Sequence, residues 1–156
     1  MTNEQRQLVD NIRIAIAVLS KEEEIYRQTV ELIDGFSDDF DWTGIYLLRD
    51  GILEVGPYIG PETPHTRIEL NQGICGAAAV EKKTIKVDDV KSDSRFLACS
   101  LSTRSEIVVP LMDGQTVIGQ IDIDSNRTSQ FTSDDQVMLE EIATVVVDRL
   151  KQVGRQ

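Results

Sequence analysis

Residues 105–125, SEIVVPLMDGQTVIGQIDIDS, constrain the fold more than any other stretch of the sequence. Two apolar runs, 106–112 and 116–124, flank Asp113-Gly114, and a D-G pair between such runs is typical of a β-hairpin turn. The stretch therefore predicts two paired antiparallel strands.

Side chains of the second strand alternate between the two faces of the sheet. One face takes the small and aliphatic residues Val117, Gly119, Ile121 and Ile123, and the other takes Gln120, Asp122 and Asp124. If that second face is covered, two carboxylates about 7 Å apart lose their water and repel each other. Glu106 on the partner strand can bring a third carboxylate. The pattern predicts one wall of a small-molecule site that accepts a positively charged group, with a solvated outer face of an ordinary hairpin as the open alternative.

Charge and length exclude several classes of protein. The 156 residues, 40% of them hydrophobic, suffice for one globular domain, which we expect over 1–156. The formal charge of −11 disfavours nucleic acid and anionic membranes as partners. The sequence shows neither an apolar run of about 18 residues nor a signal-peptide pattern at its polar N-terminus, so we expect a cytoplasmic protein. In that reducing compartment its two cysteines, Cys75 and Cys99, are not expected to form a static disulfide.

Periodicity places the remaining elements and predicts an α+β fold. A helical region (1–36) breaks near Ser20, which we expect to cap the second helix. The sheet and its loops (40–126) begin with a hairpin turning at Asp50-Gly51. After it come a loop at 60–66, a short helix opened by Gly73, a strand at 84–87 and a long loop at 88–104. A C-terminal helix (132–153) starts at a capping box and carries an apolar stripe: Val137, Ile142, Val145, Val146 and Leu150.

Two cysteines and two aromatic residues are candidates for chemistry. Cys75 lies at a helix N-terminus, where the partial positive charge favours the thiolate, and Cys99 lies in the long loop. Trp42 and Tyr46 share a face of one strand, and aromatic rings beside carboxylates form a natural receptor for an ammonium group. The alternatives are that both cysteines are small apolar fillers and that both aromatics belong to the core.

No metal site is expected from ligand spacing. His65 is the only histidine, and no cysteine or acidic cluster stands near it at ligand spacing. The sequence also lacks a phosphate-binding glycine motif and a nucleophile elbow.

Several motifs together resemble the GAF domain family. They are DWTGIYLL, GPYIG, GICGAAA, VDDVKSD, SEIVVPL, VIGQIDIDS and FTSDD, and within the family they are similar to the free methionine-(R)-sulfoxide reductases. The resemblance implies an antiparallel sheet of about six strands. It also implies terminal helices on one face of that sheet and a loop-covered ligand pocket on the other.

The resemblance also implies an activity and its residues. Cys99 matches the attacking thiol and Cys75 a resolving thiol, while His65 stands at the other resolving position and Phe96 and Ser100 replace the flanking histidine and aspartate of the family motif. The substrate pocket would be formed by Trp42, Tyr46, Glu106, Asp122 and Asp124. The family needs no bound cofactor and is reduced by a thioredoxin-type partner, and pairing of the N-terminal helices would give a homodimer. A non-catalytic GAF sensor module that binds a small molecule is the alternative.

Overall fold

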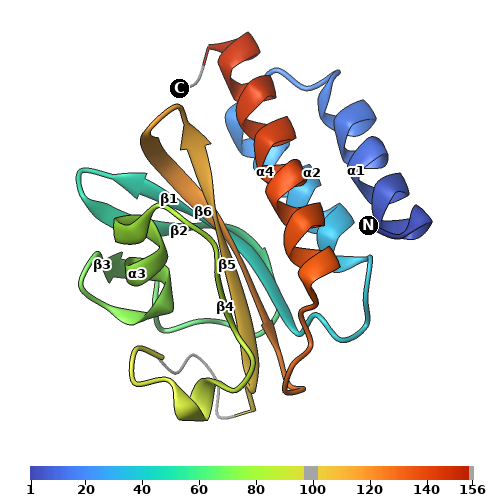
Figure 1. The fold of residues 1–156 in the computed structure, drawn as a ribbon. Coiled ribbons are helices and arrows are strands. Elements are labelled where there is room, and N and C mark those ends of the chain that lie inside the picture. Colours follow the sequence, from blue (N-terminus) through green and yellow to red (C-terminus); the bar gives the residue numbers. More distant parts are fainter. Residues whose placement is uncertain (97–101, 155–156) are drawn as a thin grey trace.

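The computed structural model describes residues 1–96 and 102–154, and over these residues the fold is α+β, as predicted. A six-stranded sheet has the order β3-β2-β1-β6-β5-β4, with every neighbouring pair antiparallel (Figure 1). The strands are β1 (Trp42–Arg49), β2 (Ile52–Ile59), β3 (Arg67–Glu69), β4 (Ile85–Val87), β5 (Ser105–Asp113) and β6 (Thr116–Ser125). The helices are α1 (Asn3–Ile16), α2 (Glu22–Asp34), α3 (Gly73–Glu81), the 3-10 helix η1 (Val90–Ser92) and α4 (Ser133–Val153).

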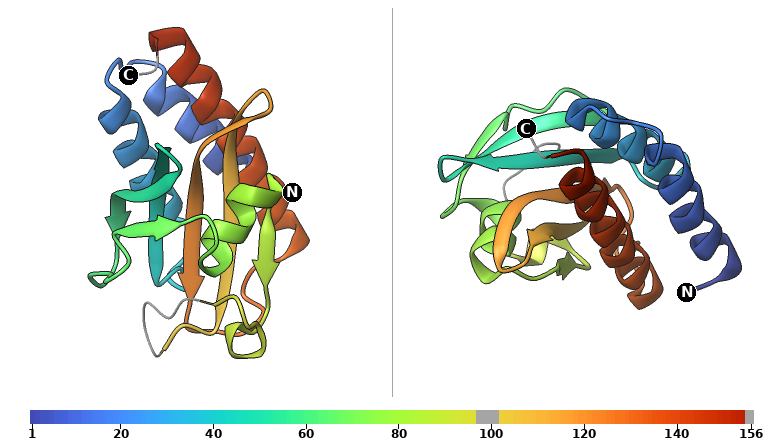
Figure 2. Two further views of the ribbon diagram at one scale, coloured as in Figure 1. Left: turned by 90° about the vertical axis from the view of Figure 1, so that its left-hand side faces the viewer. Right: turned by 90° about the horizontal axis from the view of Figure 1, so that it is seen from above.

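Helices cover the two faces of the sheet unequally. Figures 1 and 2 show α1, α2 and α4 together on one face and the short α3 on the other, which confirms the expected placement of the terminal helices. The main core lies under the three long helices, with Ile12, Ile45 and Ile121 fully buried in it. A second apolar cluster lies between α3 and the sheet, and it contains Trp42 and Cys75.

Both predicted hairpins are present, with one shift. Between β1 and β2 the turn is Asp50-Gly51, as predicted, and both residues have positive φ (53° and 76°), as a type I′ turn requires. Between β5 and β6, Asp113 pairs with Thr116, so the turn residues are Gly114 and Gln115, one place later than predicted.

A β-bulge near the β5–β6 turn corrects the predicted faces of β6. Leu111 pairs with Gly119, but Met112 pairs with Val117, so Ile118 is left without an opposite residue. An extra residue of this kind changes which face of the sheet the side chains on either side of it point to. Val117 therefore packs on the α3 side, whereas Ile121 and Ile123 pack under the long helices, and the prediction that Val117 shares their face was wrong.

Helix ends were predicted only in part. The capping box of α4 is confirmed, because Thr132 and Asp135 exchange both hydrogen bonds, at 2.9 and 3.1 Å. Ser20, however, is not the cap of α2: the N-cap is Lys21, which makes no side-chain capping bond. Along α4 the buried face also contains Met138. Val137 is 44% exposed and does not belong to the predicted stripe, because it lies one position before the buried series at 138, 142, 146 and 150. None of the described helices has the length and apolar character to cross a membrane.

Candidate functional site

Three carboxylates meet on the sheet face that α3 covers. Asp122 and Asp124 lie on β6, and Glu106 on β5 is directly opposite Asp124 in the antiparallel ladder. Their exposed fractions are only 3%, 3% and 6%, respectively. The alternative of a solvated hairpin face is therefore wrong, and the predicted meeting of the three acids is observed.

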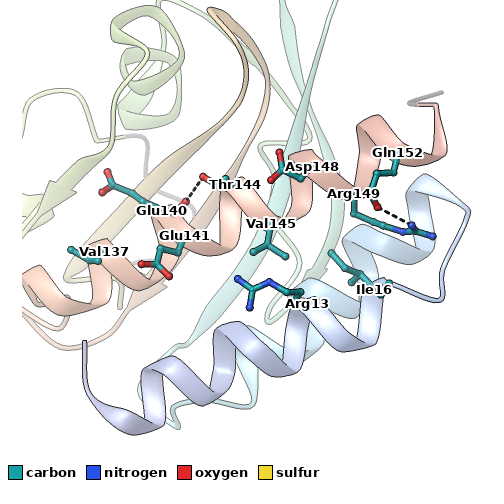
Figure 3. Close-up of a pocket in the computed structure, with 11 residues that line it drawn as sticks. Arg13, Ile16, Val137, Glu140, Glu141, Thr144, Val145, Asp148, Arg149 and Gln152 are labelled. Atoms are coloured by element: carbon teal, nitrogen blue, oxygen red, sulfur yellow. Dashed lines mark hydrogen bonds between the residues drawn. The ribbon is translucent and has the colours of Figure 1, made fainter.

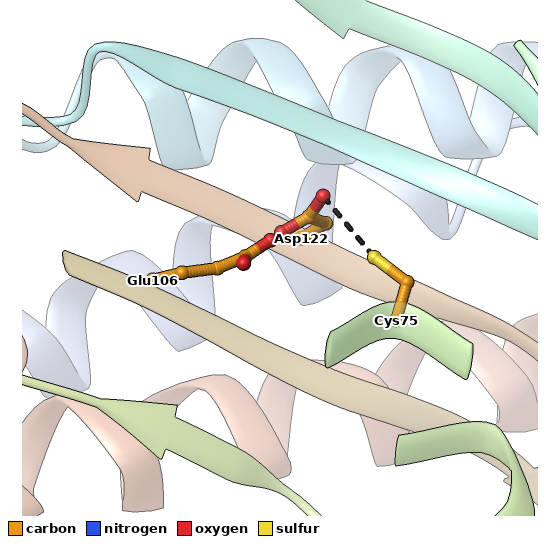
Figure 4. A group of neighbouring side chains, drawn as sticks. All are labelled: Cys75, Glu106 and Asp122. Carbon is orange, nitrogen blue, oxygen red and sulfur yellow. Dashed lines mark hydrogen bonds between the residues drawn. The ribbon is translucent and has the colours of Figure 1, made fainter. Parts of the chain in front are cut away.

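Cys75 lies directly over this group. Its Sγ atom donates a hydrogen bond to Oδ2 of Asp122 at 3.4 Å, and Nε2 of Gln120 donates to the Cys75 carbonyl at 3.1 Å. Figure 4 shows the thiol and the Glu106 side chain directed toward Asp122 from two sides. One ligand atom each from Cys75, Glu106 and Asp122 lies within 4.8 Å of the others.

The start of α3 is held close to the preceding chain by a glycine. A Cβ atom on Gly76 would lie 2.7 Å from the carbonyl oxygen of Leu70 and 2.9 Å from that of Glu69. Only a residue without a side chain fits this approach. The glycine-rich N-terminus of α3 thus allows Cys75 to lie against the sheet.

Glu106, Asp122 and Asp124 together form an acid group, and burial changes its protonation. Desolvation raises the pKa of Glu106 and of Asp124 well above the ordinary carboxyl range, and the charge of Asp122 raises both further. Burial also raises the pKa of Asp122, although its hydrogen bonds with Glu106 and Cys75 oppose the shift. Within the described residues, Oδ1 of Asp122 and Oδ1 of Asp124 are buried and have no hydrogen-bond partner. The group therefore favours bound protons or a cation.

The predicted thiolate character of Cys75 was wrong. Its pKa is raised well above the ordinary thiol value, first by burial and then by the charges of Asp122, Glu106 and Asp124. The partial charge at the start of α3 is outweighed, because a buried thiolate beside carboxylates loses hydration and is repelled. Cys75 is a protonated hydrogen-bond donor in this site.

An aromatic wall stands beside the acids. Trp42 pairs with Asp124 across β1 and β6, and its ring stacks on Tyr46 at 6.1 Å and on Tyr58 at 5.2 Å between centroids. The indole Nε1 donates to the carbonyl of Pro61 at 3.2 Å, and the Tyr46 hydroxyl donates to the carbonyl of His65 at 2.8 Å. These bonds tie the rings to the loop after β2.

A small cavity of about 120 Å³ adjoins the aromatic wall and the acids. It is lined by Asp41, Trp42, Pro61, Glu62, Ser102, Thr103, Asp124 and Asn126. Three of these eight side chains are acidic and none is basic, so the cavity favours a cationic group.

One predicted residue cannot be placed. Cys99 lies outside the described residues, as does Ser100. Phe96, the last residue before that segment, packs against the apolar cluster that contains Cys75.

Another hollow on the surface contains none of the predicted site residues. It is a groove of about 690 Å³ between α1 and α4, lined among others by Arg13 and Val145 (Figure 3). It lies on the helical side of the sheet, away from the acid group.

Sequence reasoning missed two contributors to the site. Tyr58 stacks on Trp42, and the pairing of Gly44 with Tyr58 across the β1–β2 hairpin could have indicated this contact. The sequence predicted that Gln120 lies on the same face as the acids. It did not predict the hydrogen bond from Gln120 to the Cys75 carbonyl, because α3 and β6 are far apart in the chain.

Comparison with known proteins defines the class. The GAF domain model matches residues 21–150, and the chain belongs to this family.

Within the class, its relatives include named reductases. The chain is 36% identical over 104 residues to the free methionine-R-sulfoxide reductase of Escherichia coli, an alignment that covers 67% of this chain and 62% of that protein. It is 37% identical over 105 residues to GAF domain-containing protein A of Dictyostelium discoideum, covering 67% and 66% of the two chains. Each match thus spans less than two thirds of these relatives. The structure of free methionine-R-sulfoxide reductase from Neisseria meningitidis in complex with its substrate superposes with a TM-score of 0.90 at 31% identity, covering 94% of this chain and 88% of that one.

Proposed function

We propose that this GAF protein is an oxidoreductase that reduces free methionine-(R)-sulfoxide to methionine. The observation that carries the proposal is the group of buried carboxylates beside an aromatic wall, Glu106, Asp122 and Asp124 next to Trp42 and Tyr46. Its support from relatives is the similarity to named reductases, one of them solved with its substrate.

The charge of the site fits a free amino acid better than a peptide. In a free amino acid the α-ammonium is available, and buried acids with unpartnered oxygens gain a partner when it binds. The rings of Trp42 and Tyr46 supply an apolar surface for the S-methyl end of the same molecule.

The chemistry requires one nucleophile and one source of protons. Cys99 would attack the sulfoxide sulfur; the oxygen passes to the cysteine, giving a sulfenic acid and releasing methionine, so the substrate is reduced by two electrons and the cysteine is oxidised by two. A protonated carboxyl of the acid group would assist the departing oxygen, and the raised pKa values of Glu106 and Asp124 favour that protonated form. The role of Cys99 rests on the sequence resemblance.

Cys75 would resolve the sulfenic acid. Its sulfur would bond to that of Cys99 with loss of water, and a thioredoxin-type dithiol would then reduce the disulfide. Asp122 is placed to take the proton of the attacking thiol, because its Oδ2 already accepts the hydrogen bond from Sγ. No bound cofactor takes part in this scheme.

The test is a coupled assay with thioredoxin, thioredoxin reductase and NADPH. We expect turnover with the R epimer of free methionine sulfoxide, little with the S epimer, and a large loss when the α-amine is acetylated. Cys99→Ser should abolish turnover, whereas Cys75→Ser should lose turnover with thioredoxin and retain it with dithiothreitol.

A ligand-binding module without catalysis is the second candidate function. The Dictyostelium relative has a name that states only its domain, and His65 and Phe96 depart from the reductase motifs in this sequence. Binding of free methionine sulfoxide without turnover above the Cys99→Ser control would favour this module and contradict the reductase.

A further inference from the structure

We propose that Cys75, Glu106 and Asp122 form a binding site for a divalent cation of borderline softness, of which Zn²⁺ is the appropriate probe. The three side chains come from α3, β5 and β6, so the site exists only in the folded chain. The inference goes beyond the proposed reductase activity, and because both use the same carboxylates and thiol, a bound ion and a substrate ammonium would compete for this site.

The spacing of the three ligand atoms is compatible with a metal site. The Cys75 sulfur and one carboxylate oxygen each from Glu106 and Asp122 lie within 4.8 Å of one another. Zinc bonds of about 2.0–2.3 Å place neighbouring ligand atoms roughly 3.3–3.8 Å apart. Small rotations of the two acidic side chains close the difference, and the thiol is already directed at Asp122 (Figure 4).

The mixture of donor atoms selects the kind of ion. Thiolate sulfur together with carboxylate oxygen suits Zn²⁺ and its analogues Co²⁺ and Cd²⁺, whereas Ca²⁺ and Mg²⁺ bind oxygen only. Asp124 lies opposite Glu106 in the ladder, on the same face of the sheet but outside the group of three ligand atoms.

Unpartnered oxygens are the independent sign of a missing ligand. In the described part of the chain, Oδ1 of Asp122 and Oδ1 of Asp124 have no hydrogen-bond partner, and both residues are only 3% exposed. A buried carboxylate oxygen without a partner is costly, and a cation bound by Asp122 supplies such a partner. Gln120 already fixes the backbone of Cys75 by its amide, as a supporting residue of a metal site does.

Charge balances when the ion enters. The thiol proton and any protons held by the carboxyl groups leave to the buffer, and the positive ion takes their place among the thiolate and carboxylates.

The test uses the full chain carrying Cys99→Ser, so that Cys75 is the only thiol. Competition with a chromophoric chelator should give one Zn²⁺ per chain, and Co²⁺ should give a thiolate-to-cobalt charge-transfer band. Adding Cys75→Ser should remove the band and weaken Zn²⁺ binding by at least the roughly tenfold loss that removal of even a supporting group causes. Asp122→Asn, which keeps the side-chain shape, should weaken Zn²⁺ binding with the fold intact by circular dichroism.

The matched control is Glu31→Gln, which removes an exposed acid of α2, on the other face of the sheet and outside the proposed ligand set. It should leave Zn²⁺ affinity and the cobalt spectrum unchanged. A parent protein without the charge-transfer band overturns the site, whatever the variants do. Equal Zn²⁺ affinity in the parent and the Asp122→Asn variant also overturns it.

Discussion

The Sγ atom of Cys75 lies 3.4 Å from Oδ2 of Asp122, although the two residues are 47 positions apart in the chain. This contact links the helix above the sheet to the central hairpin. It makes the thiol a member of the acid group, so the reactivity of Cys75 and the charge of Glu106, Asp122 and Asp124 depend on each other.

The first prediction concerns the accessibility of Cys75. In the Cys99→Ser protein, the remaining thiol should react with Ellman's reagent at least about 100-fold more slowly in the native state than in denaturant, because burial opposes both access and ionisation. Stopped-flow absorbance measures both rates. Equal rates in the two states would contradict the buried, protonated thiol.

The second prediction concerns stability and pH. In the folded protein the pKa of Glu106 is raised above its ordinary value of 4.5, so between that value and the raised one the folded state binds more protons than the unfolded state. The contribution of Glu106 to the free energy of unfolding is therefore fully present below pH 4.5, and it is lost as pH rises through the pKa of Glu106 in the folded state. Glu106→Gln should raise the free energy of unfolding at pH 7 by on the order of 1 kcal/mol and flatten its decline with pH.

Urea unfolding at a series of pH values, with a chelator present, tests this prediction. The exposed Glu62→Gln change serves as the control and should shift the curve by less than about 0.5 kcal/mol. A parent protein that becomes more stable as pH rises above 4.5, with Glu106→Gln removing the gain, would reverse the sign and refute the shift.

The third prediction concerns the position of the Trp42 indole ring. A Cβ atom on Gly44 would lie 2.5 and 2.7 Å from two ring atoms of Trp42 and 2.8 Å from Cβ of Tyr58. Gly44→Ala should therefore displace the ring, destabilise the fold by about 1–3 kcal/mol and change the fluorescence of this sole tryptophan. Gly35→Ala is the matched control, since its Cβ atom would meet the nearest atom at 3.4 Å. Unchanged fluorescence in Gly44→Ala would show that the ring does not pack there.

The fourth prediction concerns the anchor of the loop after β2. Tyr46→Phe removes the hydroxyl that donates to the His65 carbonyl at 2.8 Å, and it should cost about 1 kcal/mol of stability. In the proposed reductase it should raise KM more than it lowers kcat, because the loop supports the wall against which substrate binds. Tyr58→Phe keeps the ring against Trp42 and should have a smaller effect on KM. A fall in kcat alone, with KM unchanged, would argue against this supporting role.

The local pattern of the sequence determined much of the fold. Alternation along residues 42–48 and 116–124 predicted the two hairpins and put Trp42 on the face of Tyr46 and Asp122 on the face of Asp124. The capping box at Thr132 was also predicted from the sequence. Such features depend on neighbours within a few positions, which is why they can be found without the tertiary structure.

Only the tertiary structure decided what covers each face and what the site can do. The pKa of Cys75 moved opposite to the prediction because desolvation and charge come from β5 and β6, which meet α3 only after folding. The bulge beside Ile118 reversed the face of Val117, and the burial of the acids depends on α3 lying over them. Desolvation and register are set by segments far apart in the chain, and no local pattern encodes them.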